Sequence, residues 1–200
     1  MYNDFTLELI EERFGIKNVM EMLHTTKIAA QPSEPLRQAI LTANDLPIRS
    51  SKANSEAIVF PILTDLRMRN ANFFTIQSGC SLNADKEQGL RGTCDFVLAK
   101  ECGSLTLNTP FFALVQAEKG DIDAAIPQCA AQLIGAKIFN VKKGTPIETA
   151  YGCVTTGKTW TFIRVTDKIS IDKKMYYTDN MPELLSVFQT ILEPFKTILK

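Results

Sequence analysis

Three segments, GTCDFVLAK (92–100), PFFALVQAEK (110–119) and DIDAAIPQCAAQ (121–132), decide the fold of this chain. The first two read as strands because apolar, β-branched and aromatic residues dominate them, and the third reads as a helix that begins near Asp121. Side chains alternate between the two sides of a strand, so Gln116 and Glu118 share one face of the second strand. We expect that face to meet Asp95 on the first strand.

This pattern resembles the PD-(D/E)xK nuclease superfamily, in which two neighbouring strands bring acidic side chains together at a metal site. In one branch, a strand of the form VEAK precedes a helix with a glutamine pair. Here VQAE (115–118) precedes Gln128 and Gln132, and 12 positions separate Gln116 from Gln128. The resemblance covers roughly residues 55–165 in one order, with Glu56 in the place of an upstream acid and YGCVTTG (151–157) in that of a late hairpin.

The resemblance implies an α/β fold of the restriction-endonuclease-like type, a central mixed sheet with helices on both sides, here with additional N-terminal helices. It also implies a metal-dependent endonuclease that hydrolyses DNA phosphodiesters with Mg²⁺ or Mn²⁺. Asp95, Glu118 and Glu56 would then be metal ligands, and Gln116 a neutral ligand or a group that orients water. Gln128 and Gln132 would contact phosphate, water or the strand residues.

The chain departs from the family at two positions. Where the signature has an acid and then a lysine, this chain has Gln116 and Glu118. An amide carbonyl can bind a hard cation, but the positive charge that helps to polarise the attacking water is missing. Lys119 points to the opposite face of a regular strand, so it reaches the site only through a bulge. A second hypothesis is therefore a catalytically inactive nuclease-fold module that binds a protein or a nucleic acid.

Each candidate also has a structural interpretation. Asp95 lies in an apolar run, where a carboxylate is costly to bury unless it is paired, hydrogen-bonded or metal-bound; the alternative is a capping role at a strand end. Glu56 can stabilise the positive end of a helix dipole in the first turn. Gln128 and Gln132 are four apart and share a helix face, which can simply be a polar stripe.

The length and the net charge limit the number of domains and the mode of DNA contact. The 200 residues suffice for one domain, with a helical extension over 1–50 and a nuclease-like core over 51–200. Lys plus Arg equals Asp plus Glu at 22 each, so contact with DNA must be local. No apolar run is long enough for a membrane span and no signal peptide is visible, so we expect a cytoplasmic protein without a membrane partner. A homo-oligomer or a protein partner stays open.

Two further motifs argue against other classes. Five cysteines without a C-x-x-C pair and a lone histidine, His24, speak against a disulfide framework, a structural zinc site and a histidine-based triad. The segment GCVTTGKT (152–159) satisfies the pattern of a phosphate-binding loop. The residues after it alternate like a strand, whereas a true phosphate-binding loop leads into a helix. Nucleotide hydrolysis is therefore disfavoured.

The remaining elements follow from periodicity and turn signals. Helices are predicted over 4–14, 17–23, 36–44, 51–69 with a kink or the start of a second segment at Pro61, 122–137 and 181–199. Strands are predicted over 72–78, 92–100, 110–115, 147–154, 159–165 and 169–178, with a loop from Gly79 through 83–89.

Overall fold

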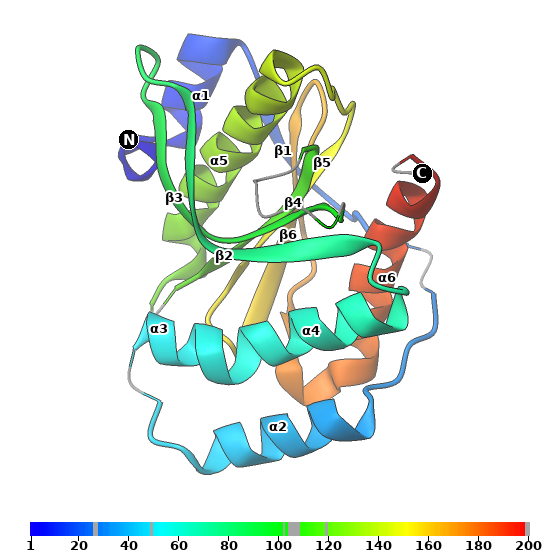
Figure 1. Cartoon of the computed structure of the whole chain (residues 1–200). Coiled ribbons are helices and arrows are strands. Elements are labelled where there is room, and N and C mark those ends of the chain that lie inside the picture. The colour runs from blue at the N-terminus through cyan, green and yellow to red at the C-terminus, as the bar shows by residue number, and fades with distance from the viewer. Residues whose placement is uncertain (26–27, 49, 102, 104–108, 119, 199–200) are drawn as a thin grey trace.

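A computed structural model describes residues 1–25, 28–48, 50–101, 103, 109–118 and 120–198 (Figure 1). In this part of the chain one mixed sheet has the strand order β1-β7-β6-β5-β4-β3-β2, and β8 pairs with β6. The strands are β1 (Asn18–Glu21), β2 (Phe74–Asp85), β3 (Leu90–Lys100), β4 (Phe111–Ala117), β5 (Ala150–Thr155), β6 (Thr159–Val165), β7 (Ile169–Asp172) and β8 (Tyr176–Tyr177).

Helices cover both faces of this sheet (Figure 1). They are α1 (Leu7–Phe14), α2 (Glu34–Asp45), α3 (Ser51–Asn54), α4 (Phe60–Arg69), α5 (Ile122–Lys142) and α6 (Met181–Ile198), with short turns η1 (Tyr2–Asp4), η2 (Ser55–Val59) and η3 (Thr178–Asn180). One core packs beneath α2, α4 and α6, and a second packs beneath α1 and α5. The predicted α/β class, with a mixed sheet flanked by helices, is confirmed. None of the described helices is long and apolar enough to cross a membrane.

The central strand β4 is buried along its whole length, as expected for a strand covered by helices on both faces. It runs antiparallel to β3 and parallel to β5, and α5 forms the connection between β4 and β5. The sequence predicts an apolar run over 110–115 with Gln116 and Glu118 at the end of the strand, and in the structure β4 ends at Ala117, so that Glu118 follows it. The ends of β3 and β4 nearest Asp95 and Gln116 therefore lie side by side.

The hairpin of β2 and β3 bends sharply over the edge of the sheet (Figure 1). Phe74 packs in the core beneath α4, whereas Cys80 and Leu82 on the same strand pack in the core beneath α5. The change occurs at Gly79, whose φ of +63° favours a residue without a side chain. The prediction that β2 stops before Gly79 is therefore wrong: the glycine turns the strand from one core to the other without ending it.

The N-terminal segment is not entirely helical. Residues 17–23, predicted as a helix, contain strand β1, which pairs in parallel with β7. This short edge strand exposes most of its side chains, and its pairing partner lies about 150 residues away. Local spacing could not reveal that partner, which is why tertiary context overrides the predicted helix.

Several other boundaries differ from the prediction. α5 continues to Lys142, β5 starts at Ala150, and the single strand predicted over 169–178 is divided into β7 and β8. The helix over 51–69 is present as α3, a wide π turn at η2 and α4, and Pro61 lies in the first turn of α4, which is the predicted start of a second segment. Proline has no N–H to donate to the preceding turn, so the helix accommodates it by a local change of register.

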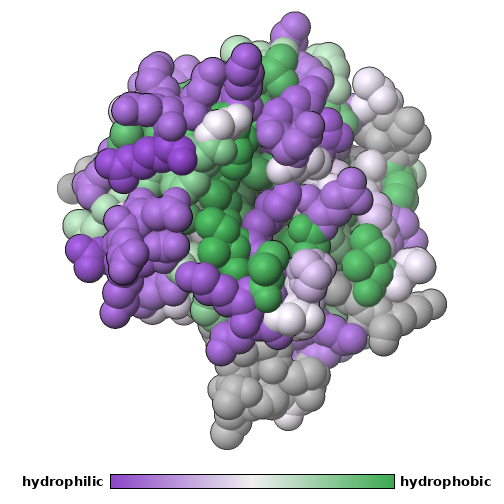
Figure 2. Space-filling model, turned by 90° about the horizontal axis from the view of Figure 1, so that it is seen from above, coloured by the Kyte–Doolittle hydropathy of each residue, from purple (hydrophilic) through white to green (hydrophobic). Residues whose placement is uncertain are grey.

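The molecular surface is mixed in character. On the face seen from above in Figure 2, hydrophilic side chains surround a hollow strip of apolar ones. The equal numbers of acidic and basic residues in the sequence are consistent with such a surface, because neither charge is present in excess.

Candidate functional site

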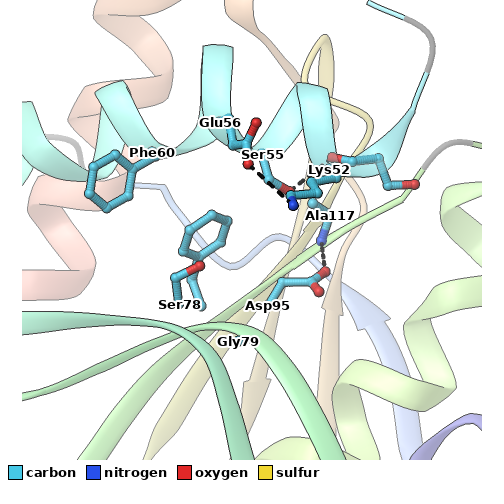
Figure 3. Close-up of a pocket in the computed structure, with 10 residues that line it drawn as sticks. Lys52, Ser55, Glu56, Phe60, Ser78, Gly79, Asp95 and Ala117 are labelled. Carbon is cyan, nitrogen blue, oxygen red and sulfur yellow. Dashed lines mark hydrogen bonds and ion pairs between the residues drawn. The ribbon is translucent and has the colours of Figure 1, made fainter.

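A cavity of about 560 Å³ lies between the helix α3–η2–α4 and the sheet (Figure 3). This volume is in the range of small-ligand pockets. The helix supplies one wall and the sheet supplies the other. The lining residues are Ser51, Lys52, Ser55, Glu56, Phe60, Ser78, Gly79, Asp95, Phe96 and Ala117.

Asp95 lies on the sheet side of this cavity, at the point where the hairpin of β2 and β3 passes from the core beneath α4 to the core beneath α5. Ser78 pairs with Phe96 and Cys80 with Cys94, so Asp95 stands opposite Gly79. Its Oδ2 accepts a hydrogen bond of 2.7 Å from the backbone N–H of Ala117 on β4. Burial raises the pKa of the Asp95 carboxyl, the Ala117 N–H partly opposes that rise, and the nearby Glu118 carboxylate adds to it.

Gln116, Glu118 and Gln132 form a hydrogen-bonded chain. The Gln132 Nε2 donates to the Gln116 Oε1 at 3.0 Å, and the Gln116 Nε2 donates to the Glu118 Oε1 at 3.2 Å. The Gln132 Nε2 also lies 3.3 Å from the carbonyl oxygen of Thr93 on β3. Gln116 and Gln132 are only 5% and 1% exposed, so this chain crosses the interior between β4 and α5.

The expected meeting of Asp95 with Gln116 and Glu118 takes a different form. Asp95 binds the backbone of Ala117, the residue between them, and Ala117 packs in the core beneath α4 while Gln116 reaches toward α5. Neither Gln116 nor Glu118 lines the cavity. The structure thus brings Asp95 within electrostatic range of Glu118 and directs the Gln116 amide away from the cavity.

Glu56 enters the cavity from the opposite wall. Its side chain lies across the cavity from Asp95 in Figure 3, and its Oε1 is 3.9 Å from the Lys52 ammonium. Both side chains are exposed, so the pair contributes little to stability and leaves the carboxylate and the ammonium accessible. The upstream acid is thus close to the candidate site, on a separate element.

The two helix glutamines lie in different surroundings. Gln132 belongs to the buried chain, whereas Gln128 is half-buried and its side chain makes no hydrogen bond with the described residues. The structural interpretation as a polar stripe fits Gln128, and the interpretation as a group that orients strand residues fits Gln132. Lys119, considered as a replacement for the missing lysine, lies outside the described residues.

The oxygen atoms at this site are of the type that a hard cation prefers, but there are few of them. Asp95 and Glu118 offer carboxylate oxygens, which Mg²⁺ and Mn²⁺ prefer. The carbonyl oxygen of Gln116 already accepts from Gln132. Among residues that the structure describes, no group of three or more His, Cys, Asp or Glu side chains is arranged to hold a metal ion. A cation here would rely on two carboxylates and on water.

Cysteine and histidine chemistry lies elsewhere. Cys80, Cys94, Cys129 and Cys153 are buried as free thiols. Burial raises the pKa of the Cys129 thiol to about 12, which keeps it protonated and unreactive at neutral pH. His24 is buried against the rings of Phe162 and Tyr176, at the edge formed by β1 and β7.

Sequence reasoning missed the rest of the cavity wall. Lys52 and Phe60 each lie four residues from the predicted Glu56, which places them near it on a helix surface and was the available signal. Gly79 offered a second signal, because a glycine inside a strand pattern often marks a bend or a close approach. No family model, curated protein or solved structure matches this chain.

Proposed function

We propose that the protein is a divalent-metal-dependent, nuclease-like protein with a variant site, which acts on DNA phosphodiesters in the cytoplasm. The observation that carries this proposal is Asp95: a carboxylate whose charged form is disfavoured by burial lines a cavity within electrostatic range of Glu118. A cation bound beside Asp95 would relieve both the burial of its charge and the repulsion from Glu118. Perturbed carboxyls in cavities are candidates for catalysis.

The arrangement of elements supports the same proposal. β3 with Asp95 lies beside β4 with Gln116, Glu118 follows the end of β4, and α5 with Gln132 comes next in the chain. This is the order in which the PD-(D/E)xK resemblance places its acids and its helix glutamines. The finer assignment of a restriction-endonuclease-like fold is part of the proposal.

The residues would divide the work as follows. Asp95 and Glu118 would hold Mg²⁺ or Mn²⁺, and such a cation supplies charge stabilisation at the phosphoryl oxygens and a more acidic bound water. The Ala117 N–H holds the Asp95 carboxylate in one orientation, and Gln116 does the same for Glu118. Glu56 is the auxiliary acid on the facing wall.

Cleavage of DNA tests this proposal directly. Purified protein is incubated with duplex and single-stranded DNA and Mg²⁺ or Mn²⁺, beside Asp95→Ala and the control Glu87→Ala. Glu87 is an acid in the turn between β2 and β3, outside the cavity lining. We expect cleavage by the parent and by Glu87→Ala, and none by Asp95→Ala. Equal cleavage by all three proteins, or by none, would overturn catalysis at this site.

A catalytically inactive nuclease-fold module that binds a protein or a nucleic acid is the second candidate. The observation that favours it is the Gln116 amide, whose carbonyl and amino groups are both engaged, with Gln132 and with Glu118. Calorimetric titration with Mn²⁺ separates the two candidates. Binding that Asp95→Ala abolishes favours the nuclease, and absence of binding favours the inactive module.

A further inference from the structure

Phe60 is an exposed aromatic side chain at the entrance of the cavity. It is 45% exposed, although it lines the same cavity as Asp95. It also borders a second cavity, between α2 and α4, so its ring separates two hollows on this surface. A phenylalanine so exposed contributes little to the core, and its ring is accessible to a ligand in the cavity.

A second ring fixes the orientation of Phe60. Phe96, which is 2% exposed and follows Asp95 directly in β3, stacks on Phe60 with ring centroids 6.3 Å apart and an interplanar angle of 27°. Aromatic pairs of this geometry are mutually attractive. Phe96 therefore holds the Phe60 ring above the sheet next to Asp95, and the exposed part of the ring stays available to a ligand.

The cavity is polar at its other end. Lys52, Ser51 and Ser55 lie on the preceding turns of the helix, and Figure 3 places Lys52 and Phe60 on opposite sides of Glu56. Eight residues separate Lys52 from Phe60, a distance of roughly 12 Å along a helix. An aromatic platform at one end and an ammonium with two hydroxyls at the other match a nucleobase and its phosphate.

The geometry points to a single-stranded nucleic acid as the ligand of this cavity, with one unpaired base stacked on Phe60 and the adjoining phosphate near Lys52. The inference rests on the proposed function, because it names the substrate class of the same site. Bases in a duplex are stacked on their neighbours and cannot offer a face to Phe60.

Fluorescence anisotropy with a labelled oligothymidylate tests this inference. The buffer contains EDTA, which removes divalent metal and so prevents cleavage during the measurement. The ligands are this oligomer, an abasic strand of the same length and a duplex. The variants are Phe60→Leu, Phe60→Tyr and Tyr177→Leu, the last removing an exposed aromatic residue that does not line the cavity. Tyrosine preserves the ring, so it serves as the conservative rescue.

We expect Phe60→Leu to weaken binding of oligothymidylate by about 5- to 100-fold, the loss that removal of one stacking platform causes. Phe60→Tyr and Tyr177→Leu should bind like the parent, and the abasic strand should bind the parent no better than it binds Phe60→Leu. Equal binding of oligothymidylate by parent and Phe60→Leu, or a parent that prefers the duplex, would overturn the inference.

The outcome is distinct from that of the cleavage test. Phe60-dependent binding without any cleavage would leave the inference standing and remove the proposed nuclease activity. Asp95-dependent cleavage, together with equal binding of the single strand by the parent and by Phe60→Leu, would support the nuclease activity and overturn the inference.

Discussion

The backbone N–H of Ala117 donates a hydrogen bond of 2.7 Å to the carboxylate of Asp95 and so joins β4 to β3 beside the cavity. This single bond partly offsets the burial of a charge that no described basic side chain contacts through a hydrogen bond or ion pair. Asp95 thus lies where a carboxylate lowers stability, a feature expected of a group retained for binding or chemistry.

Asp95→Asn should stabilise the protein at neutral pH. The asparagine carbonyl can still accept from Ala117, and the repulsion from Glu118 disappears. A relief of about 1 kcal/mol corresponds to a rise in melting temperature of roughly 2–4 °C for a chain of this size. Thermal unfolding at pH 7 measures it, and a lower melting temperature in the variant would show that the charge of Asp95 stabilises the fold.

The pH dependence of this effect has a defined sign. The pKa of Asp95 is raised in the folded state, so the folded protein retains a proton that the unfolded chain has lost. Stability therefore falls as the pH rises through the interval between the ordinary pKa of aspartate and the raised one. The advantage of Asp95→Asn should shrink as the pH is lowered below the ordinary value, where both states are protonated.

Gln132→Leu should destabilise the protein by about 2–3 kcal/mol. Leucine fills a similar volume, but it leaves the Gln116 carbonyl and the Thr93 carbonyl without their donor in a buried place. Gln128→Leu is the matched control, one helical turn earlier, and should change stability by less than about 0.5 kcal/mol. Urea unfolding of both variants measures the difference. Equal effects would contradict the division of the two glutamines.

The resemblance to a known family and the apolar strand pattern together predict Asp95, Gln116 and Glu118 on neighbouring strands. The structure has Asp95 in β3 and Gln116 in β4, whereas Glu118 follows the end of β4. Which side chain binds which partner depended on atoms that spacing does not specify. Asp95 accepts from the Ala117 N–H, and Gln116 is bound to Gln132 on the other face of β4. The sequence also did not reveal that the Phe60 ring stacks on Phe96, because the two residues are 36 positions apart.

Lys158→Ala should leave ATP binding unchanged, because the parent should bind none. The turn between β5 and β6 uses its own amides: the Gly157 N–H donates to the Thr155 hydroxyl, and the Thr159 N–H donates to the Thr156 hydroxyl. A phosphate-binding loop needs such amides free at the start of a helix. Calorimetric titration with MgATP checks this, and a heat signal lost in Lys158→Ala would revive nucleotide binding.

Gly135→Ala should destabilise the protein through a steric contact with Tyr2. A Cβ at position 135 would lie 2.3 Å from the Tyr2 hydroxyl oxygen, and we expect a loss of about 1–3 kcal/mol from overpacking. That hydroxyl is buried without a hydrogen-bond partner among the described residues, so Tyr2→Phe alone should be neutral or stabilising by about 1 kcal/mol.

The double variant Tyr2→Phe, Gly135→Ala gives the decisive comparison. Removing the hydroxyl relieves the closest contact but leaves ring carbons 3.1 Å from the new Cβ, so the rescue should be partial. The two changes should therefore combine with a favourable coupling of about 0.5–2 kcal/mol, measured by urea unfolding of all four proteins. Strict additivity would mean that Tyr2 moves away from α5 when Gly135 is replaced, and that η1 is only loosely held on the helix.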